Sequence, residues 1–457
     1  MQVMASTQKS MVTLAALGCV LLGLTRFGLA LQRHDNLPGF IATALVQGIV
    51  YLAAVWMVSR IESKRSVLVA ILVIAGLLRL SIVFSPPYLS DDMYRYIWDG
   101  RVQAAGINPY RFVPADKQLA PLRDQSIYSH INRRDYAHTI YPPLAQAVFL
   151  GVTRISESVT GMKLAMVGFE GIAIWLIIRL LTAWRLPPER VLIYAWHPLA
   201  IWEIAGSGHV EAVLVALIAL ALWSRSRDSR ALTGAALAGA ALIKLFPALL
   251  VAALYRRWDW KMPLAFAGTF LLAYLPYAGV GSGAIGFLPV YLQEEGLVHG
   301  WGIFPLSVAD RLLGLHEASG SAYLIFAMAV LATVALCLIL RSGAVADDRH
   351  VANALILALT FTVLLSPHYA WYFLWLVPML CFRLHVPALY LTLASFLLYE
   401  LLLHTSGPVF FRVSVLLYLP FALIALVCWL AKRAQSEAPA IQESVPEESR
   451  NATCVSK

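Results

Sequence analysis

Residues 38–58 read PGFIATALVQGIVYLAAVWMV, a run of 21 residues without a charged side chain. A helix needs about 20 predominantly apolar residues to cross the hydrocarbon core of a bilayer, so this run is long enough to span it. Runs of similar character recur from Met11 almost to Leu430. We therefore predict an all-α polytopic membrane protein whose transmembrane domain, residues 1–433, fills nearly the whole chain.

The composition supports lipid as the solvent of this chain. Its residues are 60% hydrophobic and 13% charged, whereas about 25% of the residues of a soluble domain are charged. The formal net charge is +9, but no run of Lys and Arg interleaved with aromatic residues points to nucleic acid, so we expect no nucleic-acid partner. The five cysteines have neither the spacing of a disulfide framework nor that of a metal knuckle.

Hydropathy and charge together predict the topology. We expect about 12 transmembrane helices, near residues 11–32, 38–58, 67–84, 163–182, 190–205, 209–224, 261–278, 321–341, 351–366, 369–383, 386–402 and 411–430. The first could be a signal peptide, but it is long and a second span follows at once, so we interpret it as an uncleaved helix. Basic residues cluster in alternate loops, which favours the cytoplasmic side for these loops and a multi-pass protein of the cytoplasmic (inner) membrane.

The basic loops alternate between the two sides of the membrane only if two of the apolar segments do not cross it. Residues 141–155 begin with two prolines and are short, so we expect a helix at the outer surface. Residues 231–255 have basic residues at both ends and Lys244 in the middle, which predicts a re-entrant hairpin of two half-helices. Both termini then lie inside, with outer loops at 85–161 and 279–320. The polar residues 434–457 predict a disordered cytoplasmic tail.

The first outer loop is too long for a mere connector, since most connections span roughly 4–6 residues. It opens SPPYLSDDMYRYIWDGRVQAAGINPYRF at Ser85. Ser90 is a suitable N-cap and Gly106 a suitable stop, which predicts a helix of about 15 residues at the outer leaflet. Asp91 and Asp92 occupy its first turn. The helix macrodipole favours acids there, so capping and catalysis both remain open for this pair.

Several motifs resemble a known group of enzymes. The diacid is followed by YRYIWDGR at 94–101, GINPY at 106–110 and TIYPPLAQAVF at 139–149. Further motifs are GSGHVEA at 206–212, ALIKLFPALL at 241–250 and SPHYAWYFLWLVP at 366–378. Over most of its length the chain resembles the GT-C superfamily of integral-membrane glycosyltransferases. Within it, the likeness is to bacterial mannosyltransferases that use polyprenyl-phosphate-mannose.

The resemblance implies an outward-facing, inverting transferase. It would pass a hexose, mannose by the likeness, from a polyprenyl-phosphate donor to a hydroxyl of a lipid or glycan acceptor. An aspartate of the outer loop would be the general base, which corresponds to Asp91 or Asp92. We prefer Asp92 because Tyr96 and Asp99 share its helical face. Membrane lipid, the lipid-linked donor and the acceptor are then the expected partners.

The remaining site residues are assigned by charge and position. The leaving phosphate needs nearby cations, and the acceptor sugar needs carboxylates or aromatic faces. For the phosphate we consider Arg95, Arg101, His209, His368 and Lys244; for the acceptor we consider Asp99, Tyr96, Glu211, Glu294 and His299.

Some of these residues also have simpler explanations. Arg95 could pair with Asp91, and His209 could pair with Glu211. His368 could anchor the chain at the interface, and Lys244 could extend toward the inner surface.

The sequence contains no ligand-spaced metal motif, so we expect no required metal and no cofactor. The rival from another class is a transporter or flippase for a lipid-linked sugar. Such a protein should carry its charges in the middle of its spans, on discontinuous helices. Here most acids lie at one predicted surface, which favours the transferase.

Overall fold

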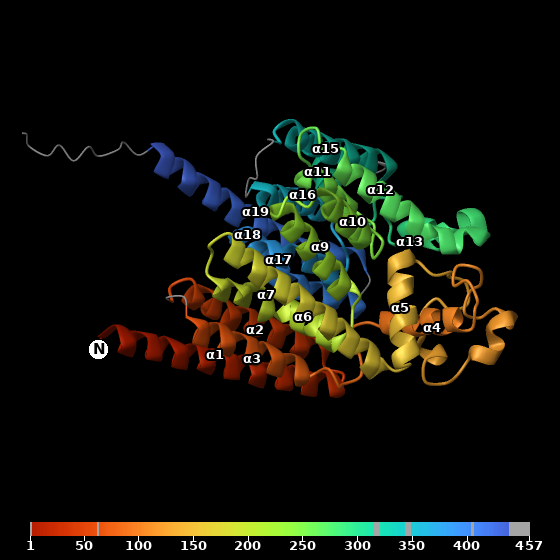
Figure 1. Cartoon of the computed structure of the whole chain (residues 1–457), viewed down its shortest axis with the longest axis horizontal. Coiled ribbons are helices and arrows are strands. Elements are labelled where there is room, and N and C mark those ends of the chain that lie inside the picture. The colour runs from red at the N-terminus through yellow and green to blue at the C-terminus, as the bar shows by residue number, and fades with distance from the viewer. Residues whose placement is uncertain (1, 62–63, 315–319, 343–348, 404–405, 438–457) are drawn as a thin grey trace, which may run out of the picture.

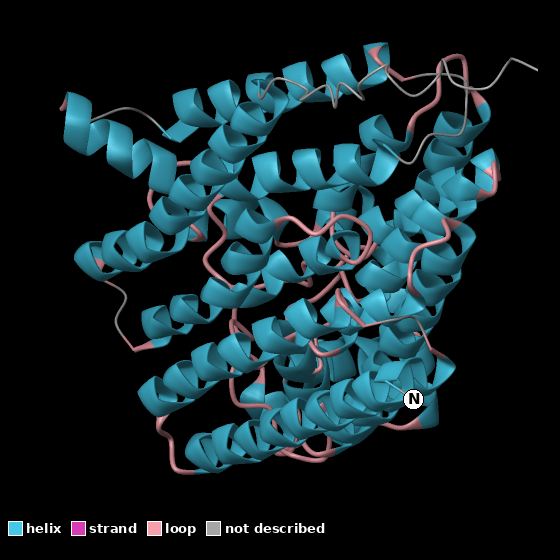
Figure 2. Ribbon diagram, turned by 90° about the vertical axis from the view of Figure 1, so that its left-hand side faces the viewer, coloured by secondary structure: helices cyan, strands magenta, loops and turns pink. Residues whose placement is uncertain are grey.

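The structure is a computed structural model that describes residues 2–61, 64–314, 320–342, 349–403 and 406–437. Within these ranges the regular elements are helices, and no strand is present (Figure 2). The predicted all-α class is therefore confirmed. Residues 438–457, most of the predicted tail, lie outside the described residues, whereas the last helix continues to Glu437.

The α-helices are α1 (Gln2–Arg33), α2 (Leu37–Val58), α3 (Arg65–Leu80), α4 (Asp92–Ala104), α5 (Pro143–Ile155), α6 (Val159–Ala183), α7 (Leu192–Ala195), α8 (Pro198–Ala200), α9 (Glu211–Ser226), α10 (Arg230–Ala241), α11 (Leu250–Leu254), α12 (Lys261–Tyr274), α13 (Leu288–Glu294), α14 (Phe304–Leu313), α15 (Gly320–Leu340), α16 (Arg349–Leu365), α17 (Val377–Leu380), α18 (Val386–Ala394) and α19 (Gly407–Glu437). The 3-10 segments are η1 (Lys117–Leu122), η2 (Tyr128–His130), η3 (Pro188–Val191), η5 (Phe246–Leu249), η6 (Leu275–Ile285), η7 (Ala370–Leu376) and η8 (Ser395–Leu402), and η4 (Ile201–Gly206) is a π-helix.

The predicted number of spans is not confirmed. Six helical stretches among the described residues are long and apolar enough to cross a membrane: Met11–Arg33, Leu37–Val58, Val159–Ala183, Lys261–Glu294, Gly320–Leu340 and Gly407–Ala434. The helices expected at 67–84, 209–224 and 351–366 are shorter, with 16, 16 and 17 residues. At 1.5 Å per residue they rise only about 24–26 Å, which is less than the roughly 30 Å of a hydrocarbon core.

Three other predicted spans are interrupted rather than short. The segment expected at 190–205 consists of η3, α7, α8 and the π-helix η4, with Pro198 opening α8. The segments expected at 369–383 and 386–402 pass between 3-10 and α-helix. Most of these residues are buried inside the protein. Irregular helix is tolerated there because neighbouring protein groups, rather than lipid, surround the backbone.

Residues 231–255 turn back to the same end of the molecule through α10, η5 and α11, as the hairpin prediction requires, while their re-entrant position in the membrane stays a prediction. At the open end, Arg225 Nε donates to the carbonyl of Leu254 at 2.8 Å. At the tip, the carbonyl of Leu242 accepts from the amide of Ala145 at 3.2 Å, so the tip reaches the beginning of α5. Lys244 thereby lies next to the first outer loop instead of extending toward the basic end.

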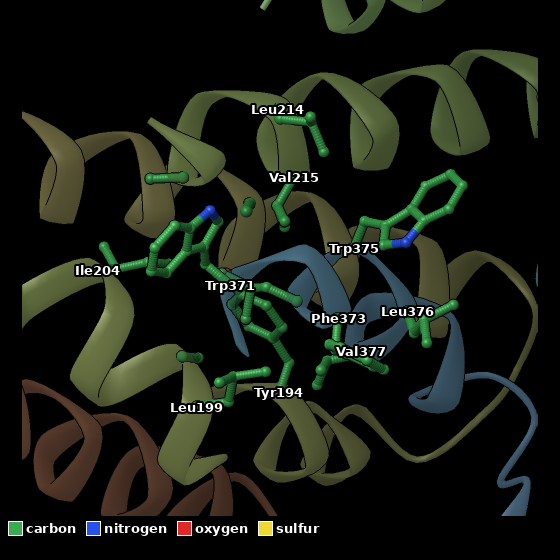
Figure 3. Packing of buried hydrophobic residues seen from close by; sticks show 14 of the residues in the cluster. Tyr194, Leu199, Ile204, Leu214, Val215, Trp371, Phe373, Trp375, Leu376 and Val377 are labelled. Atoms are coloured by element: carbon green, nitrogen blue, oxygen red, sulfur yellow. The ribbon is translucent and has the colours of Figure 1, made fainter. Parts of the chain in front are cut away.

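The centre of the protein is packed with aromatic residues from η7 and its neighbours (Figure 3). Trp371, Phe373 and Trp375 are buried there, together with Tyr194 of α7. Large aromatic side chains bury roughly 150–250 Å² each, which makes them major contributors to such a core. This core supports the loop that leads into η7, where His368 and Tyr369 lie.

The chain ends and the first loop lie at opposite ends of the molecule. In Figure 1, α1 begins and α19 ends at the left, whereas α4 and α5 lie at the right with α13 near them. The two helices α4 and α5 pack against each other, and both contact α6. The predicted opposition of termini and first outer loop is therefore seen in the fold. Which end faces the cytoplasm stays a prediction.

Candidate active site

The diacid lies at the start of α4, one residue later than the sequence indicated. Asp92 is the first helical residue and Asp91 takes the N-cap position, while Ser90 Oγ accepts a hydrogen bond from the Asp92 amide at 3.2 Å. The Asp91 side chain makes no capping hydrogen bond. Gly106, with φ of +77°, follows the last turn as predicted. Helix capping therefore does not explain the Asp91 carboxylate.

The two carboxylates differ in their surroundings. Asp91 is exposed, whereas Asp92 is partly buried. Burial raises the pKa of Asp92 above its ordinary value, against the opposing effects of Lys244, Tyr141, Arg133 and Asn132. The pKa of Asp91 is also raised, first by burial and then by the neighbouring Asp92. A carboxylate with a raised pKa is a stronger base once ionised, which suits proton abstraction.

Lys244, at the tip of the hairpin, is the principal cation beside Asp92. Among the charges that act on Asp92, that of Lys244 acts most strongly. Its ammonium pairs with Glu211 at the start of α9 and lies 4.5 Å from the centre of the Tyr372 ring. The side chain of Lys244 is 13% exposed. Its predicted extension toward the inner surface is wrong, because Glu211 and Tyr372 hold it beside the first loop.

A chain of buried polar side chains continues from Glu211 into the protein. His209 Nδ1 lies 3.8 Å from Glu211, and its Nε2 lies 3.4 Å from Glu203 in the π-helix η4. The Tyr399 hydroxyl donates to Glu203. The His209 ring stacks on Trp371 with ring centroids 4.3 Å apart. The predicted proximity of His209 and Glu211 is confirmed, but both side chains are fully buried in this cluster.

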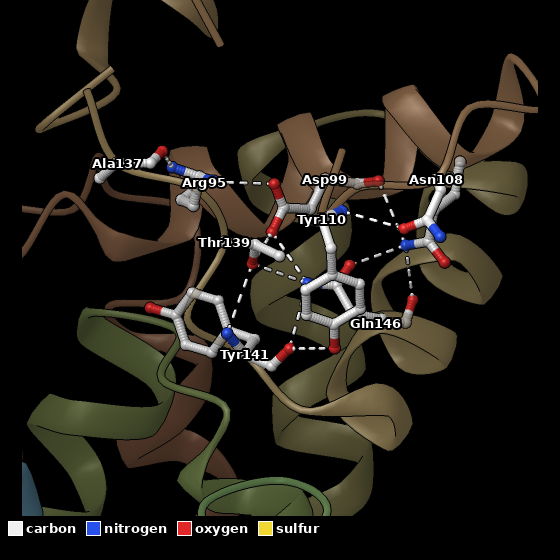
Figure 4. Close-up of polar contacts among 9 residues, drawn as sticks. Arg95, Asp99, Asn108, Tyr110, Ala137, Thr139, Tyr141 and Gln146 are labelled. Atoms are coloured by element: carbon white, nitrogen blue, oxygen red, sulfur yellow. Dashed lines mark hydrogen bonds and ion pairs between the residues drawn. The ribbon is translucent and has the colours of Figure 1, made fainter. Parts of the chain in front are cut away.

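Asp99 and Arg95 belong to a separate, structural network (Figure 4). Arg95 Nε donates to Asp99 Oδ1 at 2.8 Å, so Arg95 pairs with the acid at i+4 rather than with Asp91. Thr139 and Gln146 donate to Asp99 Oδ2 at 2.5 and 2.9 Å. Arg95 also donates to the Ala137 carbonyl at 3.1 Å. This network joins α4 to α5 and to the segment just before it, and both Asp99 oxygens already accept hydrogen bonds within it.

Arg101 likewise makes structural contacts within the first loop. Its guanidinium donates to Asp124 at 2.7 Å and to the Leu122 carbonyl at 2.8 Å, and it also pairs with Glu157. Tyr96 is fully buried, and its ring stacks on Phe149 with centroids 4.5 Å apart. The structure therefore brings neither Arg101 nor Tyr96 to a position open to a ligand. Their predicted contacts with donor and acceptor are not supported by this geometry.

The second outer loop approaches the site through an arginine that the sequence did not single out. Arg133 contacts Glu294 at 2.8 Å and Glu295 at 3.6 Å. Glu295 in turn lies 3.4 Å from His368 Nδ1, and the other ring nitrogen of His368 lies 3.2 Å from the Gly302 carbonyl. These contacts tie 279–320 to the first loop and to the segment before η7.

Of the two acceptor residues predicted in the second loop, Glu294 takes part in these contacts and His299 has no part in them. Glu294 contributes to the bridge through Arg133, whereas the predicted acceptor residue His299 is an exposed residue. His368 contacts Glu295, one of the two glutamates in this bridge. Its predicted contact with phosphate stays a prediction.

An apolar cavity of about 640 Å³ lies against the first loop and against Leu245 at the hairpin tip. It is lined by the first loop and by α12 and η6, and its wall includes Tyr141 and Leu245. Tyr141 interacts with Asp92, and Leu245 follows Lys244 in the chain. Tyr141 therefore links the cavity wall to Asp92, and Leu245 links it to the hairpin tip that carries Lys244.

Sequence reasoning missed Tyr141, Asn132, Arg133 and Glu203. Tyr141 lies in the TIYPPLAQ motif and Glu203 is an acid within an apolar stretch, which is itself a functional signal. Nothing local marked Asn132 or Arg133. Among the described residues, no group of three or more His, Cys, Asp or Glu side chains is arranged to hold a metal ion.

Comparison with protein families identifies a match. The family model described as alpha-(1->6)-mannopyranosyltransferase, N-terminal domain, matches residues 6–259. The matched region contains Asp91, Asp92, Glu211 and Lys244, and more than half of the chain. No curated protein matches the chain.

Proposed function

Because the chain belongs to the alpha-(1->6)-mannopyranosyltransferase family, we propose that it transfers mannose from a polyprenyl-phosphate donor to a hydroxyl of a lipid or glycan. The reaction takes place on the outer face of the cytoplasmic membrane and inverts the anomeric centre. The observation that carries this proposal is that Lys244 has the strongest charge effect on Asp92, while Tyr141 and Leu245 connect these two residues to an apolar cavity. An apolar wall suits a prenyl chain, and a lysine suits the phosphate attached to it.

The bond changes assign a role to each group. The acceptor oxygen attacks the anomeric carbon of the donor while its proton passes to the Asp92 carboxylate. The bond between that carbon and the phosphate oxygen breaks, and the phosphate leaves with the electron pair. The ammonium of Lys244 stabilises the negative charge on the leaving phosphate. Positioned proton abstraction of this kind contributes roughly 10²–10⁴-fold to rate.

The family match favours the transferase over a transporter of lipid-linked sugars. The position of the charges supports the same choice, since Asp91 and Asp92 lie on α4 in the first loop, not within one of the six apolar stretches. Glu203 and Glu211 are buried acids of the kind that transporters contain, but the structure places Glu211 in a pair with Lys244. We therefore assign these side chains to the site of transfer.

The test exchanges each carboxylate for its amide. Asn retains the shape of Asp but is not basic, so Asp92→Asn should insert and fold normally while turnover falls on the order of 10²-fold or more. Asp91→Asn should reduce turnover less, since Asp91 does not take the proton in this mechanism. The reverse order would move the base to Asp91. Near-normal turnover in both variants would exclude the proposed mechanism.

A further inference from the structure

A short stretch of the first loop, residues 130–133, lies against the start of α4, which carries the diacid. The His130 ring stacks on Tyr94 of α4, with ring centroids 4.6 Å apart and planes 18° from parallel. The Asn132 side chain interacts with the Asp92 carboxylate. Asp91, His130 and Asn132 are all exposed. An aromatic ring, an amide and the Asp91 carboxylate thus lie at the exposed start of α4, close to Asp92.

This stretch is held in a defined position from behind. The Asp124 carboxylate accepts hydrogen bonds from the amides of Ile127 and Tyr128 at 2.9 and 3.0 Å, which fixes the η2 turn that ends at His130. Arg101 binds the same carboxylate at 2.7 Å and holds the pKa of Asp124 well below its usual range. A charge-assisted contact of this type is short and strong. Arg101 therefore fixes the loop that presents His130.

The Ser129 hydroxyl and the Arg133 backbone complete the shape of this stretch. Ser129 Oγ lies 3.0 Å from His130 Nδ1 and thereby orients the ring. Arg133 has a φ of +51°, a left-handed conformation that is uncommon for a residue other than glycine. The side chain of Arg133 points to Glu294 of the second loop at 2.8 Å. Asn132, the residue before this turn, is exposed and interacts with Asp92.

The general base must lie within about 3 Å of the acceptor hydroxyl. Asp92 also interacts with the little-exposed side chains of Lys244 and Tyr141, and Tyr141 lines the apolar cavity that the proposed function assigns to the donor. The acceptor therefore has to approach from the exposed side. The first protein groups that it meets there are those on residues 130–133 and on Asp91.

We infer that Tyr94, His130 and Asn132, together with Asp91, form the acceptor subsite and that this subsite binds a pyranose ring of a glycan. The inference rests on the proposed function, because it requires a donor on the inner side of Asp92. The open face of the His130 ring can pack on the C–H face of a pyranose. The Asn132 amide and the Asp91 carboxylate can bind its hydroxyls. A simple aliphatic alcohol has neither feature.

The experiment measures steady-state kinetics of the full-length protein, with the polyprenyl-phosphate-mannose and an oligomannoside varied in turn. His130→Ala and Asn132→Ala should each raise the KM for the oligomannoside about three- to tenfold and leave the KM for the donor unchanged. His130→Phe retains an aromatic ring and should restore most of the affinity. Tyr136→Ala is the matched control, since Tyr136 is an exposed ring of the same loop that packs on Phe287 instead of α4.

A second acceptor separates this inference from the proposed function. Transfer to a long-chain primary alcohol, which lacks a ring, should be equally efficient in the wild type and in His130→Ala. An unchanged KM for the oligomannoside, or an equal rise in the KM for the donor, would overturn the subsite while leaving the role of Asp92 intact. If Asp92→Asn retains full transfer to either acceptor, it is the proposed function that fails.

Discussion

At the scale of single residues, the chemistry depends on how differently two adjacent aspartates are placed. Asp91 is exposed beside His130, whereas Asp92 is partly buried and faces Lys244. Their carboxylates are neighbours in sequence, and the charge of Asp92 raises the pKa of Asp91. One carboxylate can therefore act as the base while the other binds the acceptor.

The raised pKa of Asp92 leads to a prediction about pH. A general base must be ionised, so kcat/KM should fall as the pH drops through the pKa of Asp92. Because burial raises this pKa, the acidic limb should lie above the ordinary range of aspartate. The measurement is a pH–rate profile of the wild type alongside Asp92→Asn. An acidic limb at or below the ordinary value, or an unchanged limb in the variant, would contradict the assignment.

The diacid and Lys244 could be predicted from the sequence, but the partners of Arg95 could not. Arg95 has an acid at i−4, Asp91, and another at i+4, Asp99, and helical spacing allows both pairs, with a slight preference for the acid that precedes the base. The choice of Asp99 is made by Thr139 and Gln146, which reach it from about 40 residues further along the chain. Such contacts depend on tertiary packing, which local spacing does not reveal.

At the scale of elements, the re-entrant hairpin is the feature that the charge pattern predicted best. Arg230 and Arg256 at its two ends required both ends to lie on one side, and the contacts of Arg225 with Leu254 confirm that return. The interruptions at 190–205 and 369–402 were not predictable from hydropathy. Hydropathy detects only apolar runs. A segment buried in protein can contain π or 3-10 turns and still have an uninterrupted apolar sequence, so hydropathy does not reveal these turns.

The hairpin tip gives a prediction for Lys244. Lys244→Ala should raise the KM for the donor about tenfold or more, since a hydrogen bond to a charged group contributes roughly 1.5–3 kcal/mol. The KM for the acceptor should stay unchanged. Lys244→Arg retains the charge and should retain part of the affinity.

Loss of Lys244 also leaves Glu211 buried without its partner, which can cost roughly 3–5 kcal/mol of stability. The double variant Lys244→Ala with Glu211→Gln removes that unpaired charge. Its thermal unfolding temperature should recover while the rise in donor KM persists. If the double variant recovers the wild-type KM for the donor as well as its stability, Lys244 acts only on folding.

At the scale of the whole molecule, the arrangement separates the ends of the chain from the site. The start of α1 and the end of α19 lie opposite α4 and α5 (Figure 1). The outer-face assignment depends on which of these ends faces the cytoplasm, and the basic loops predict that the termini do. A donor that reaches the site through the lipid is consistent with that orientation.

The orientation can be measured with single cysteines in a cysteine-free background. Gln118 is exposed in the first loop and Arg227 is exposed in the turn between α9 and α10. In intact cells, a membrane-impermeant thiol reagent should label Gln118→Cys from outside and should not label Arg227→Cys. Labelling of Arg227→Cys alone would invert the topology and remove the argument for a lipid-borne donor.

The central claim is that this protein transfers mannose from a lipid-linked phosphate donor. The most direct measurement supplies the purified full-length protein in liposomes with labelled polyprenyl-phosphate-mannose or labelled nucleotide-mannose, each with an oligomannoside. We predict mannose transfer from the lipid-linked donor alone, with one polyprenyl phosphate released for each mannose transferred. Transfer from the nucleotide sugar, or movement of the lipid-linked donor across the bilayer without any transfer, would contradict the claim.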